Sequence, residues 1–469
     1  MSAGAPAVRG RAHGRCLGNL PSSYRDPLEP RTPQRPSPCQ HPGSCQRRHR
    51  QLLLPRQDEA IVMVTACLAP QAVIEGLLSK RWSLKCPFPS TAMPSDDDTR
   101  QSFQEAMALV ELSAKEGGTA AKRFMGTRAA WLPGSDIIPQ DPEQAQAFHR
   151  GHKAAYGGHV YTQSGLAVCQ AWKELEDKRG VKDSERLGIH TIHGYFTSVG
   201  LSDRPFIYEV TPINTNRSFS TLSVTARQPT APSTNPRGDP FPAADASLPL
   251  NSNLCFTAIC SFKLPEPHSM GISAQEDSPQ KRFANILSSR SAEEWPPAPP
   301  LDIDSIVALV GADRIGTFPI VDMKKVDMTG YNADRPLHER RELLLYRLLK
   351  PLPADGTDGW DANAHVLVHA YVADRNGLLM AGNHLGLGFR FGKAASLSYT
   401  FVVHVNVDEA VLKHEDGGWW VQEACFPRAA AGRGIVMSKI WSPQGVHVAT
   451  EYQDGLIRAE KEERERGKL

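Results

Sequence analysis

The hydrophobic and polar positions predict one helix followed by several strands, and this order occurs twice along the chain. The first helix begins at the Gly pair of "YGGHVYTQSGLAVCQAWKELE" (156–176), where apolar residues recur three or four positions apart. Strands are predicted where apolar residues alternate with Ser and Thr or run on without a break. In the first part these are "IHTIHGYFTSV" (189–199), "FIYEVTPI" (206–213), "SFSTLSVTARQ" (218–228) and "LCFTAICSFKL" (254–264).

A second set of strands follows in the remaining part of the chain. It comprises "FPIVDMKKVDM" (318–328), "RRELLLYRLL" (340–349), "ASLSYTFVVHVNV" (395–407), "WWVQEACFP" (419–427), "GIVMSKIWS" (434–442) and "VHVATEYQDGLIR" (446–458). Weak internal symmetry of this kind indicates a duplicated domain. A sheet must cover its apolar face, and a helix does so. We therefore expect an α+β protein with a tandem hotdog fold, in which each half is a curved antiparallel sheet wrapped around a central helix.

The stretch "HVLVHAYVADRNGLLMAG" (365–382) connects the two kinds of pattern in the second part. Its Val-rich beginning predicts a buried strand, and the residues after Asp374 predict a short helix loosened by Gly. On local sequence alone, Asp374 is interpreted as the N-cap of that helix, because its carboxylate can accept a hydrogen bond from a first-turn amide. A functional interpretation requires partners elsewhere in the chain.

Changes in composition and the positions of Pro-rich stretches suggest five segments. Residues 1–92 are rich in Arg and Pro and predict a disordered extension. A first hotdog domain is expected over 93–270, beginning with a helical pattern and interrupted by an exposed Pro-rich insertion at 229–250. A linker spans 271–300 and a second hotdog domain 301–458. The last residues, 459–469, form a charged tail.

Charge and cysteine content exclude several classes of protein. The 53 Lys and Arg balance 51 Asp and Glu, so the whole-chain charge gives no sign of nucleic-acid binding. The nine Cys are scattered singly, which indicates neither a disulfide framework nor a zinc site. The longest uncharged apolar stretch, 60–74, is too short to span a membrane.

Several ordered motifs resemble the acyl-CoA thioesterase II family of double-hotdog enzymes. "YGGHVYTQSGLAV", "IHTIHGYFTSVGLSDRPFIYEV", "RSFSTLSVTARQ" and "CFTAICSFKLPEP" resemble its first half, and "AYVADRNGLL", "AASLSYTFVVH" and "GVHVATEYQDGLIR" its second. The resemblance covers roughly residues 100–458. It implies hydrolysis of acyl-CoA to free fatty acid and CoA by an activated water. One run departs from the family: "SYTFVVH", Ser398 to His404, stands where Asp-His-Ser-Met-Trp-Phe-His is usual, which affects the expected acyl preference more than the reaction.

The resemblance also implies the residues that would carry the reaction. The family's Asp, hydroxyl residue and Gln correspond to Asp374, Ser396 and Gln453. Asp374 would serve as the base, with its pKa raised by partial burial, while the other two hold the water. The turn Gly157-Gly158 could present helix amides to the substrate, or could simply allow a close helix–sheet contact. No metal or cofactor is expected, because CoA is part of the substrate.

Other chemistries are weighed against this reading. No GxSxG, HExxH, P-loop or dinucleotide fingerprint is present, which argues against a covalent intermediate or a metal. Two alternatives stay open: a hotdog enoyl-CoA hydratase or dehydratase, for which Asp374 and His384 are ten positions apart, and a non-catalytic acyl-CoA-binding protein.

The two ends of the chain suggest where the protein resides and what it meets. The final Gly-Lys-Leu resembles the Ser-Lys-Leu peroxisomal address, so we expect a peroxisomal protein that meets an import receptor. The Arg-rich, acid-poor beginning leaves a mitochondrial location as the alternative, with the cytoplasm as a third. Besides its acyl-CoA substrate, we expect the protein to form a homo-oligomer.

Overall fold

The computed structural model describes residues 100–113, 122–132, 154–182, 186–267, 273–299, 302–304, 307, 318–375, 377–387, 391–414 and 418–459. All of them belong to one compact unit, residues 56–469. The predicted extension over 1–92 and the tail from 460 onward lie outside the described residues, so what the sequence predicts for them stays a prediction. Within the described parts, no helix is long and apolar enough to cross a membrane.

The first half of the described chain supplies six strands and one long helix. The strands are β1 (Leu109–Leu112), β2 (Lys122–Gly126), β3 (Gly188–Phe196), β4 (Ile207–Thr215), β5 (Phe219–Arg227) and β6 (Phe256–Lys263). The long helix is α4 (Gly157–Lys178). Short helices are α2 (Phe103–Ala106) and the 3₁₀ turn η5 (Ala243–Ser247).

The second half supplies another six strands. These are β7 (Val321–Lys325), β8 (Glu342–Leu348), β9 (Phe391–Val403), β10 (Trp420–Ala430), β11 (Arg433–Trp441) and β12 (His447–Ala459). Its two main helices are α9 (Ala362–Ala373) and α10 (Gly377–His384). Between and around them are α5 (Pro279–Arg282), α6 (Ala284–Leu287), α8 (Thr329–Asn332), η7 (Ala292–Glu294), η8 (Leu337–Glu339), η9 (Thr357–Gly359) and η11 (Val407–Ala410).

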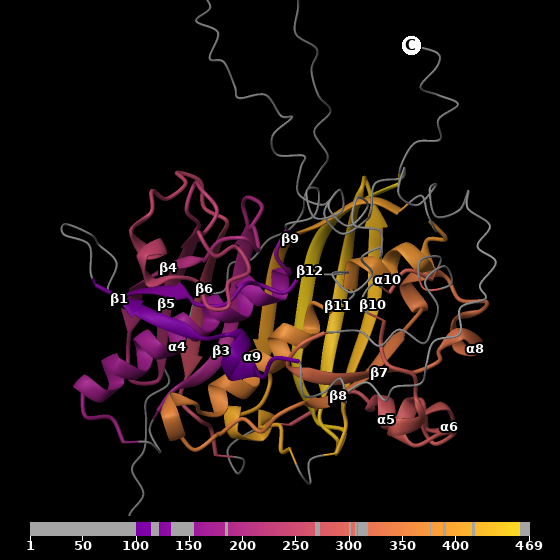
Figure 1. The fold of residues 1–469 in the computed structure, drawn as a ribbon. Helices are drawn as coiled ribbons and strands as arrows, with labels where there is room; N and C mark the ends of the chain where they lie inside the picture. Colours follow the sequence, from indigo (N-terminus) through magenta and orange to yellow (C-terminus); the bar gives the residue numbers. More distant parts are fainter. Residues whose placement is uncertain are drawn as a thin grey trace, which may run out of the picture. The chain divides into compact units, whose positions relative to one another are not determined.

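The two halves share one continuous sheet. The strand order is β1-β2-β4-β5-β6-β3-β9-β12-β11-β10-β8-β7, and neighbouring strands are antiparallel throughout. The halves meet where β3 pairs with β9, with His193 opposite Thr400. Figure 1 shows this junction between the purple and orange strands. The predicted tandem hotdog is therefore the observed fold, whereas the domain boundaries stay predictions.

The central helices of the two halves pack against each other on this sheet. α4 contacts β2, β4, β5 and β6, and α9 contacts β3, β11 and β12 as well as α4. Close approach of the two helices depends on Gly165, because a Cβ there would lie 2.5 Å from Leu367 Cδ2. The largest apolar cluster contains residues of both halves, such as Trp172 and Tyr371. One core thus spans the junction.

The prediction of a strand at 365–373 is wrong, because these residues belong to helix α9. Every residue from Ala364 to Ala373 is buried. A helix enclosed on all sides has no polar face, so its sequence lacks the period that distinguishes a helix from a buried strand. The helix begins at Asp361, whose side chain accepts a hydrogen bond from the Asn363 amide at 2.9 Å.

Two further expectations differ from the structure. The helical pattern at the start of the first domain yields only α2, which ends before β1 begins at Leu109. The Pro-rich insertion at 229–250 is not simply exposed. Phe241 and Asp245 are buried within it, and the Phe241 amide donates to the Thr127 carbonyl at 2.8 Å. The insertion thus packs onto the end of β2.

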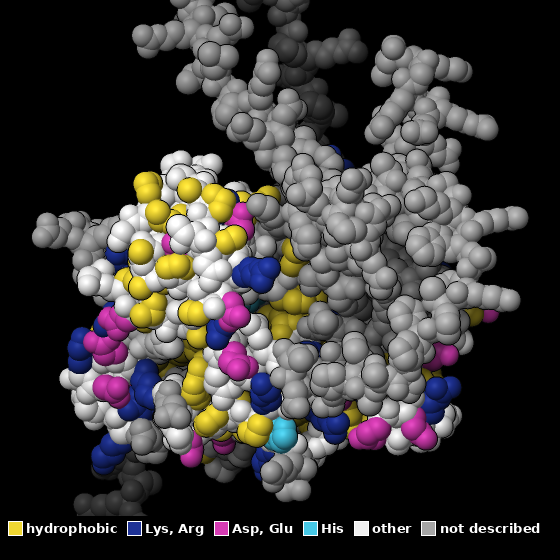
Figure 2. All heavy atoms as spheres, viewed as in Figure 1, with side chains coloured by type: hydrophobic (Ala, Val, Ile, Leu, Met, Phe, Trp, Pro, Cys, Tyr) yellow, Lys and Arg dark blue, Asp and Glu magenta, His cyan; other side chains and the backbone are white. Residues whose placement is uncertain are grey.

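The charged surface agrees with the balanced composition. On the face shown in Figure 2, Lys and Arg side chains are interspersed with Asp and Glu over the described part. This mixture of signs gives that face no broad positive field of the kind that nucleic-acid binding requires.

Candidate active site

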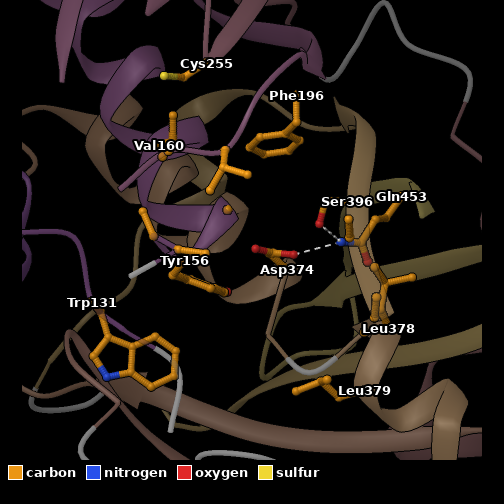
Figure 3. A pocket seen from close by; sticks show the side chains of 18 of the residues that line it. Trp131, Tyr156, Val160, Phe196, Cys255, Asp374, Leu378, Leu379, Ser396 and Gln453 are labelled. Carbon is orange, nitrogen blue, oxygen red and sulfur yellow. Dashed lines mark hydrogen bonds between the residues drawn. The ribbon is translucent and has the colours of Figure 1, made fainter. Parts of the chain in front are cut away.

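A cavity lies between the N-terminus of α4 and the C-terminus of α9 (Figure 3). It holds about 970 Å³ of empty space, its open mouth included. The first half contributes Trp131, Ala154, Ala155, Tyr156, Gly157, Val160, Phe196, Ser198, Val199, Gly200 and Cys255, and the second half Asp374, Arg375, Gly377, Leu378, Leu379, Ala394, Ala395, Ser396 and Gln453. Most of this lining is apolar, and its few polar side chains lie mainly in the second half.

Asp374 is the buried carboxylate of this cavity. It follows the last residue of α9 as its C-cap, and only 8% of it is exposed. The Gly158 amide donates to its Oδ2 at 2.5 Å, and the Gln453 Nε2 donates to its Oδ1 at 2.9 Å. The Tyr399 hydroxyl also donates to Oδ1. Three donors from three different elements therefore fix the orientation of the carboxylate.

The local interpretation of Asp374 as the N-cap of the following helix is not what the structure shows. The residue ends α9, so its own helix presents a negative dipole end to the carboxylate, which is unfavourable. The positive helix end comes from α4 of the first half, through Gly158. The carboxylate of the second half is thus stabilised by the first half.

Gln453 and Ser396 lie beside Asp374, so the structure brings together the three residues that the family resemblance implied. The Gln453 Nε2 donates to the Ser396 Oγ at 2.7 Å as well as to Asp374, as the dashed lines in Figure 3 show. The three residues come from the end of α9, from β9 and from β12. Their assembly depends on the fold, because the hydrogen-bonded residues are 79 and 57 positions apart.

A β-bulge turns Ser396 toward the site. Asp454 of β12 pairs with Ser398, but the next residue, Gly455, pairs with Ser396, so Leu397 is an extra residue on β9. A bulge of this kind changes which face of the sheet a side chain points to. Without it, strict alternation would put Ser396 on the face opposite to Tyr399.

Gly157 and Gly158, the glycine pair at the start of α4, have different positions in the site. Gly158 is occupied by its hydrogen bond to Asp374 and so serves the carboxylate rather than a substrate. Gly157 is the first residue of α4 and lines the cavity. A Cβ on Gly157 would lie 3.1 Å from Asp374 Oδ2 and 3.2 Å from Phe196 Cζ, so the missing side chain keeps this corner open.

The surroundings of Asp374 change its basicity. Burial raises the pKa of Asp374 from 3.8 to about 7, although the hydrogen bonds from Tyr399, Gly158 and Gln453 and the charge of Arg375 lower it. Burial disfavours the charged form of a carboxyl, and here that effect exceeds the effect of all its donors. A carboxylate with a pKa near neutrality is suited to accept a proton from water.

Two residues of the site were missed by the sequence analysis. Tyr399 donates to Asp374, and Glu451 is completely buried nearby on β12. Tyr399 lies within the "SYTFVVH" run that departs from the family pattern, and this departure was the available signal. Glu451 is two positions before Gln453, so it shares a face of the strand with Gln453. For Glu451, the sequence signal was a carboxyl side chain at a position that alternation places on the buried face of the strand.

Helix α10 begins against Gln453, and this gives a first prediction. A Cβ on Gly377 would lie 2.8 Å from Gln453 Oε1, so Gly377→Ala should displace Gln453 from Asp374. We expect turnover to fall about tenfold, because small misplacements in a site are costly to rate, while the melting temperature stays similar. Gly330→Ala in α8 is the matched control, since nothing lies within 4 Å of the added Cβ. Equal turnover in both variants would contradict this packing argument.

The described residues give no support for a metal in the cavity. No group of three or more His, Cys, Asp or Glu side chains among them is arranged to hold a metal ion.

Comparisons with known proteins point to one family. A family model, the acyl-CoA thioesterase N-terminal domain, matches residues 145–247. Acyl-CoA thioesterase 2 of Haemophilus influenzae is 24% identical over 66% of this chain and 89% of its own length. Acyl-coenzyme A thioesterase 8 of Homo sapiens is 23% identical over 69% of this chain and 88% of its own length.

Solved structures of similar proteins were also found. An acyl-CoA thioesterase II of Mycobacterium marinum has 20% sequence identity and a TM-score of 0.46, covering 76% of this chain and 98% of its own. A hotdog-fold protein of unknown function from Alicyclobacillus acidocaldarius has 15% identity and a TM-score of 0.45 over the same shares. The matched family model and the two curated relatives make this chain similar to the acyl-CoA thioesterases, in agreement with the resemblance of its motifs.

Proposed function

We propose that the protein hydrolyses acyl-CoA thioesters to a free acid and CoA by direct attack of a water molecule. The observation that carries the proposal is the hydrogen-bonded set of Asp374, Gln453 and Ser396 in the wall of a mainly apolar cavity. A thioester carbonyl needs a positioned water, a base and donors for the oxyanion, and this set together with the start of α4 supplies all three.

Asp374 is proposed as the base that takes a proton from the attacking water. The Gln453 Nε2 donates to both Asp374 and Ser396. Its Oε1 has no hydrogen-bond partner among the described residues, so it can accept a hydrogen bond from the other proton of the water. Ser396 accepts from Gln453, so its own hydroxyl proton is available to the water oxygen. These contacts orient a lone pair of the water toward the thioester carbon.

The start of α4 is proposed to stabilise the negative charge that develops on the carbonyl oxygen. First-turn amides lack partners inside their helix, and the helix dipole places positive charge there. Gly157, the first residue of this turn, lines the cavity. When the tetrahedral intermediate collapses, the C–S bond breaks, and the proton held by Asp374 passes to the departing CoA thiolate. Asp374 is then ionised again for the next turnover.

A covalent intermediate is not supported by the groups that line the cavity. Burial raises the pKa of the Cys255 thiol to about 11, so it carries little nucleophilic thiolate near neutral pH. Ser396 is hydrogen-bonded to an amide rather than to a histidine base. A serine without such a base is a weak nucleophile.

The hydratase alternative lacks its second catalytic group at this cavity. Its lining, as far as the structure describes it, contains no histidine. His384 is on the far end of α10, where its Nε2 is paired with Glu342 on β8 rather than facing Asp374. The geometry therefore favours hydrolysis of the thioester over addition of water to a double bond.

Release of CoA thiol from acyl-CoAs of short to long chain length tests the proposal. Turnover with at least one chain length is expected, and the preferred length will identify the acyl group that the apolar cavity accepts. Tight acyl-CoA binding without thiol release would instead support a binding protein. Loss of the conjugated absorbance of an enoyl-CoA would support a hydratase.

The pH profile gives a second prediction. Because Asp374 must be ionised to act as base, kcat/KM should be constant above its pKa of about 7 and fall as the pH decreases below it. The slope should correspond to one proton. A profile that stays flat down to about pH 5 would mean that no group with a raised pKa acts as the base.

A further inference from the structure

Glu451 is a second carboxyl close to the proposed base, and nothing in the mechanism above uses it. It lies on β12 with 0% of its surface exposed, two residues before Gln453 and opposite Phe401 of β9. Neither of its carboxyl oxygens has a hydrogen-bond partner among the described residues. An ionised carboxylate in such a position would be strongly unfavourable, because a buried charge needs paired donors.

The tyrosine hydroxyls and the carboxylate near Glu451 do not donate a hydrogen bond to it. Four titratable groups are near enough to act on it: Tyr156 at the N-cap of α4, Tyr161 within α4, Asp374 at the end of α9, and Tyr399 on β9. The Tyr156 hydroxyl donates to the Tyr371 carbonyl at 2.7 Å, and the Tyr161 hydroxyl donates to the Ile192 carbonyl at 3.0 Å.

Tyr399 and Asp374 likewise donate no hydrogen bond to Glu451. Tyr399 gives its hydroxyl proton to Asp374, and Asp374 itself accepts from three donors. On the adjoining strand β11, Ser438 pairs across from Glu451; its Oγ accepts from Gln422 at 2.9 Å and makes no hydrogen bond with either carboxyl oxygen of Glu451. Each of the three tyrosine hydroxyls thus donates its proton to a group other than Glu451, but each hydroxyl oxygen can still accept a hydrogen bond. Only a protonated Glu451 can form one with them.

The two carboxyls differ in every respect that determines where a single negative charge resides. Asp374 has donors from Gly158, Gln453 and Tyr399, and the positive charge of Arg375 acts on it. Glu451 has no amide or cationic neighbour of this kind, and burial together with the charge of Asp374 raises the pKa of Glu451 well above its usual range, although its interaction with Tyr399 lowers it. Neighbouring carboxyls in unlike environments divide acid and base roles in this way.

We propose that Glu451 is a positioning residue that keeps its proton and donates it to the Tyr399 hydroxyl, which in turn donates to Asp374. Hydrogen bonds in such a chain polarise one another, so a donor behind Tyr399 strengthens the bond from Tyr399 to the carboxylate. The chain holds Asp374 ionised at a pH where burial alone would protonate it. The protonation of Glu451 is independent of the proposed function, whereas its effect on rate rests on that function.

Three variants test the kinetic part, with the pH profile of kcat/KM as the readout. Glu451→Gln keeps an uncharged donor, so its acid limb should coincide with that of the wild type. Glu451→Leu and Tyr399→Phe each interrupt the hydrogen-bond chain. In both variants the pH below which kcat/KM falls should rise by about one unit, and activity should recover at high pH. A limb that moves downward in Glu451→Gln would mean that Glu451 was charged and would overturn the proposal. Unchanged limbs in both Glu451→Leu and Tyr399→Phe would also overturn it.

Infrared spectroscopy tests the protonation directly and does not depend on activity or on the folding of Glu451→Leu. The wild-type spectrum at about pH 8, where Asp374 is mainly ionised, should contain the carbonyl stretch of a protonated carboxylic acid that is missing in Glu451→Gln. A difference spectrum that instead shows only the loss of a carboxylate band would overturn the proposal. An inactive protein that retains the carbonyl band would reject the proposed hydrolysis and leave the protonated Glu451 intact.

Discussion

Asp374→Asn should lose thiol release by a factor of about 10²–10⁴, which is the range in which a positioned general base contributes. The substitution keeps the size and shape of the side chain but removes its ability to take a proton from water. Gly157, Ser396 and the apolar cavity wall are unchanged, so acyl-CoA should still bind. Release of thiol measured at saturating acyl-CoA, with binding measured separately, distinguishes the two effects. Normal turnover in this variant would end the proposed mechanism.

The same variant should remain folded, and the pH dependence of its stability provides the control. The pKa of Asp374 in the folded protein, about 7, is above its ordinary value of 3.8. A carboxyl with a raised pKa destabilises the fold once it ionises, and this penalty grows as the pH rises from about 4 to about 7. At about pH 8 the Asn variant should therefore melt at a similar or higher temperature than the wild type. A markedly lower melting temperature would make its inactivity uninformative.

Gln453→Met should reduce turnover about a hundredfold with a smaller change in KM. Methionine has nearly the same length but cannot donate, so Asp374 and Ser396 would each lose the hydrogen bond from the Gln453 Nε2. Loss of a preorganised polar contact in an active site has effects of this size. Steady-state kinetics of thiol release, performed above the acid limb of each protein, measures the change.

Gln422→Met is the matched control for this prediction. Gln422 is 1% exposed on β10, and its Nε2 donates to the Ala373 carbonyl at 3.0 Å and to the Ser438 Oγ at 2.9 Å. It does not line the cavity. We expect its replacement to lower the free energy of unfolding by about 1–3 kcal/mol while most of the activity is retained. If both variants lose activity equally, buried hydrogen bonding in general, rather than Gln453 at the water site, explains the loss.

The strands were largely predictable from the sequence, and the second central helix was not. Strands β3 and β5 alternate buried and more exposed positions because one face packs on the helices and the other faces outward. Helix α4 keeps a partly polar face and was recognised. Helix α9 is enclosed by the core, and Val366, Val368 and Val372 give it the composition of a strand. Burial on all sides removed the information that a periodicity argument uses.

The candidate site was predictable in its residue types but not in its geometry. Asp374, Ser396 and Gln453 were identified through motifs, and no spacing rule connects residues that are 57 and 79 positions apart. The β-bulge at Leu397 that reorients Ser396 leaves no recognisable mark in "AASLSY". The contact between Gly158 and Asp374 joins the two halves, so a reading of either half alone could not find it.

The junction between β3 and β9 makes the two halves mutually obligatory. If the chain were divided between them, each piece would present an unpaired edge strand, and edges of that kind attract other strands and promote aggregation. One piece would hold Asp374 without its amide donor, and the other would hold the amide without a carboxylate. The carboxylate and its amide donor thus come from opposite halves, so neither half alone can assemble the site.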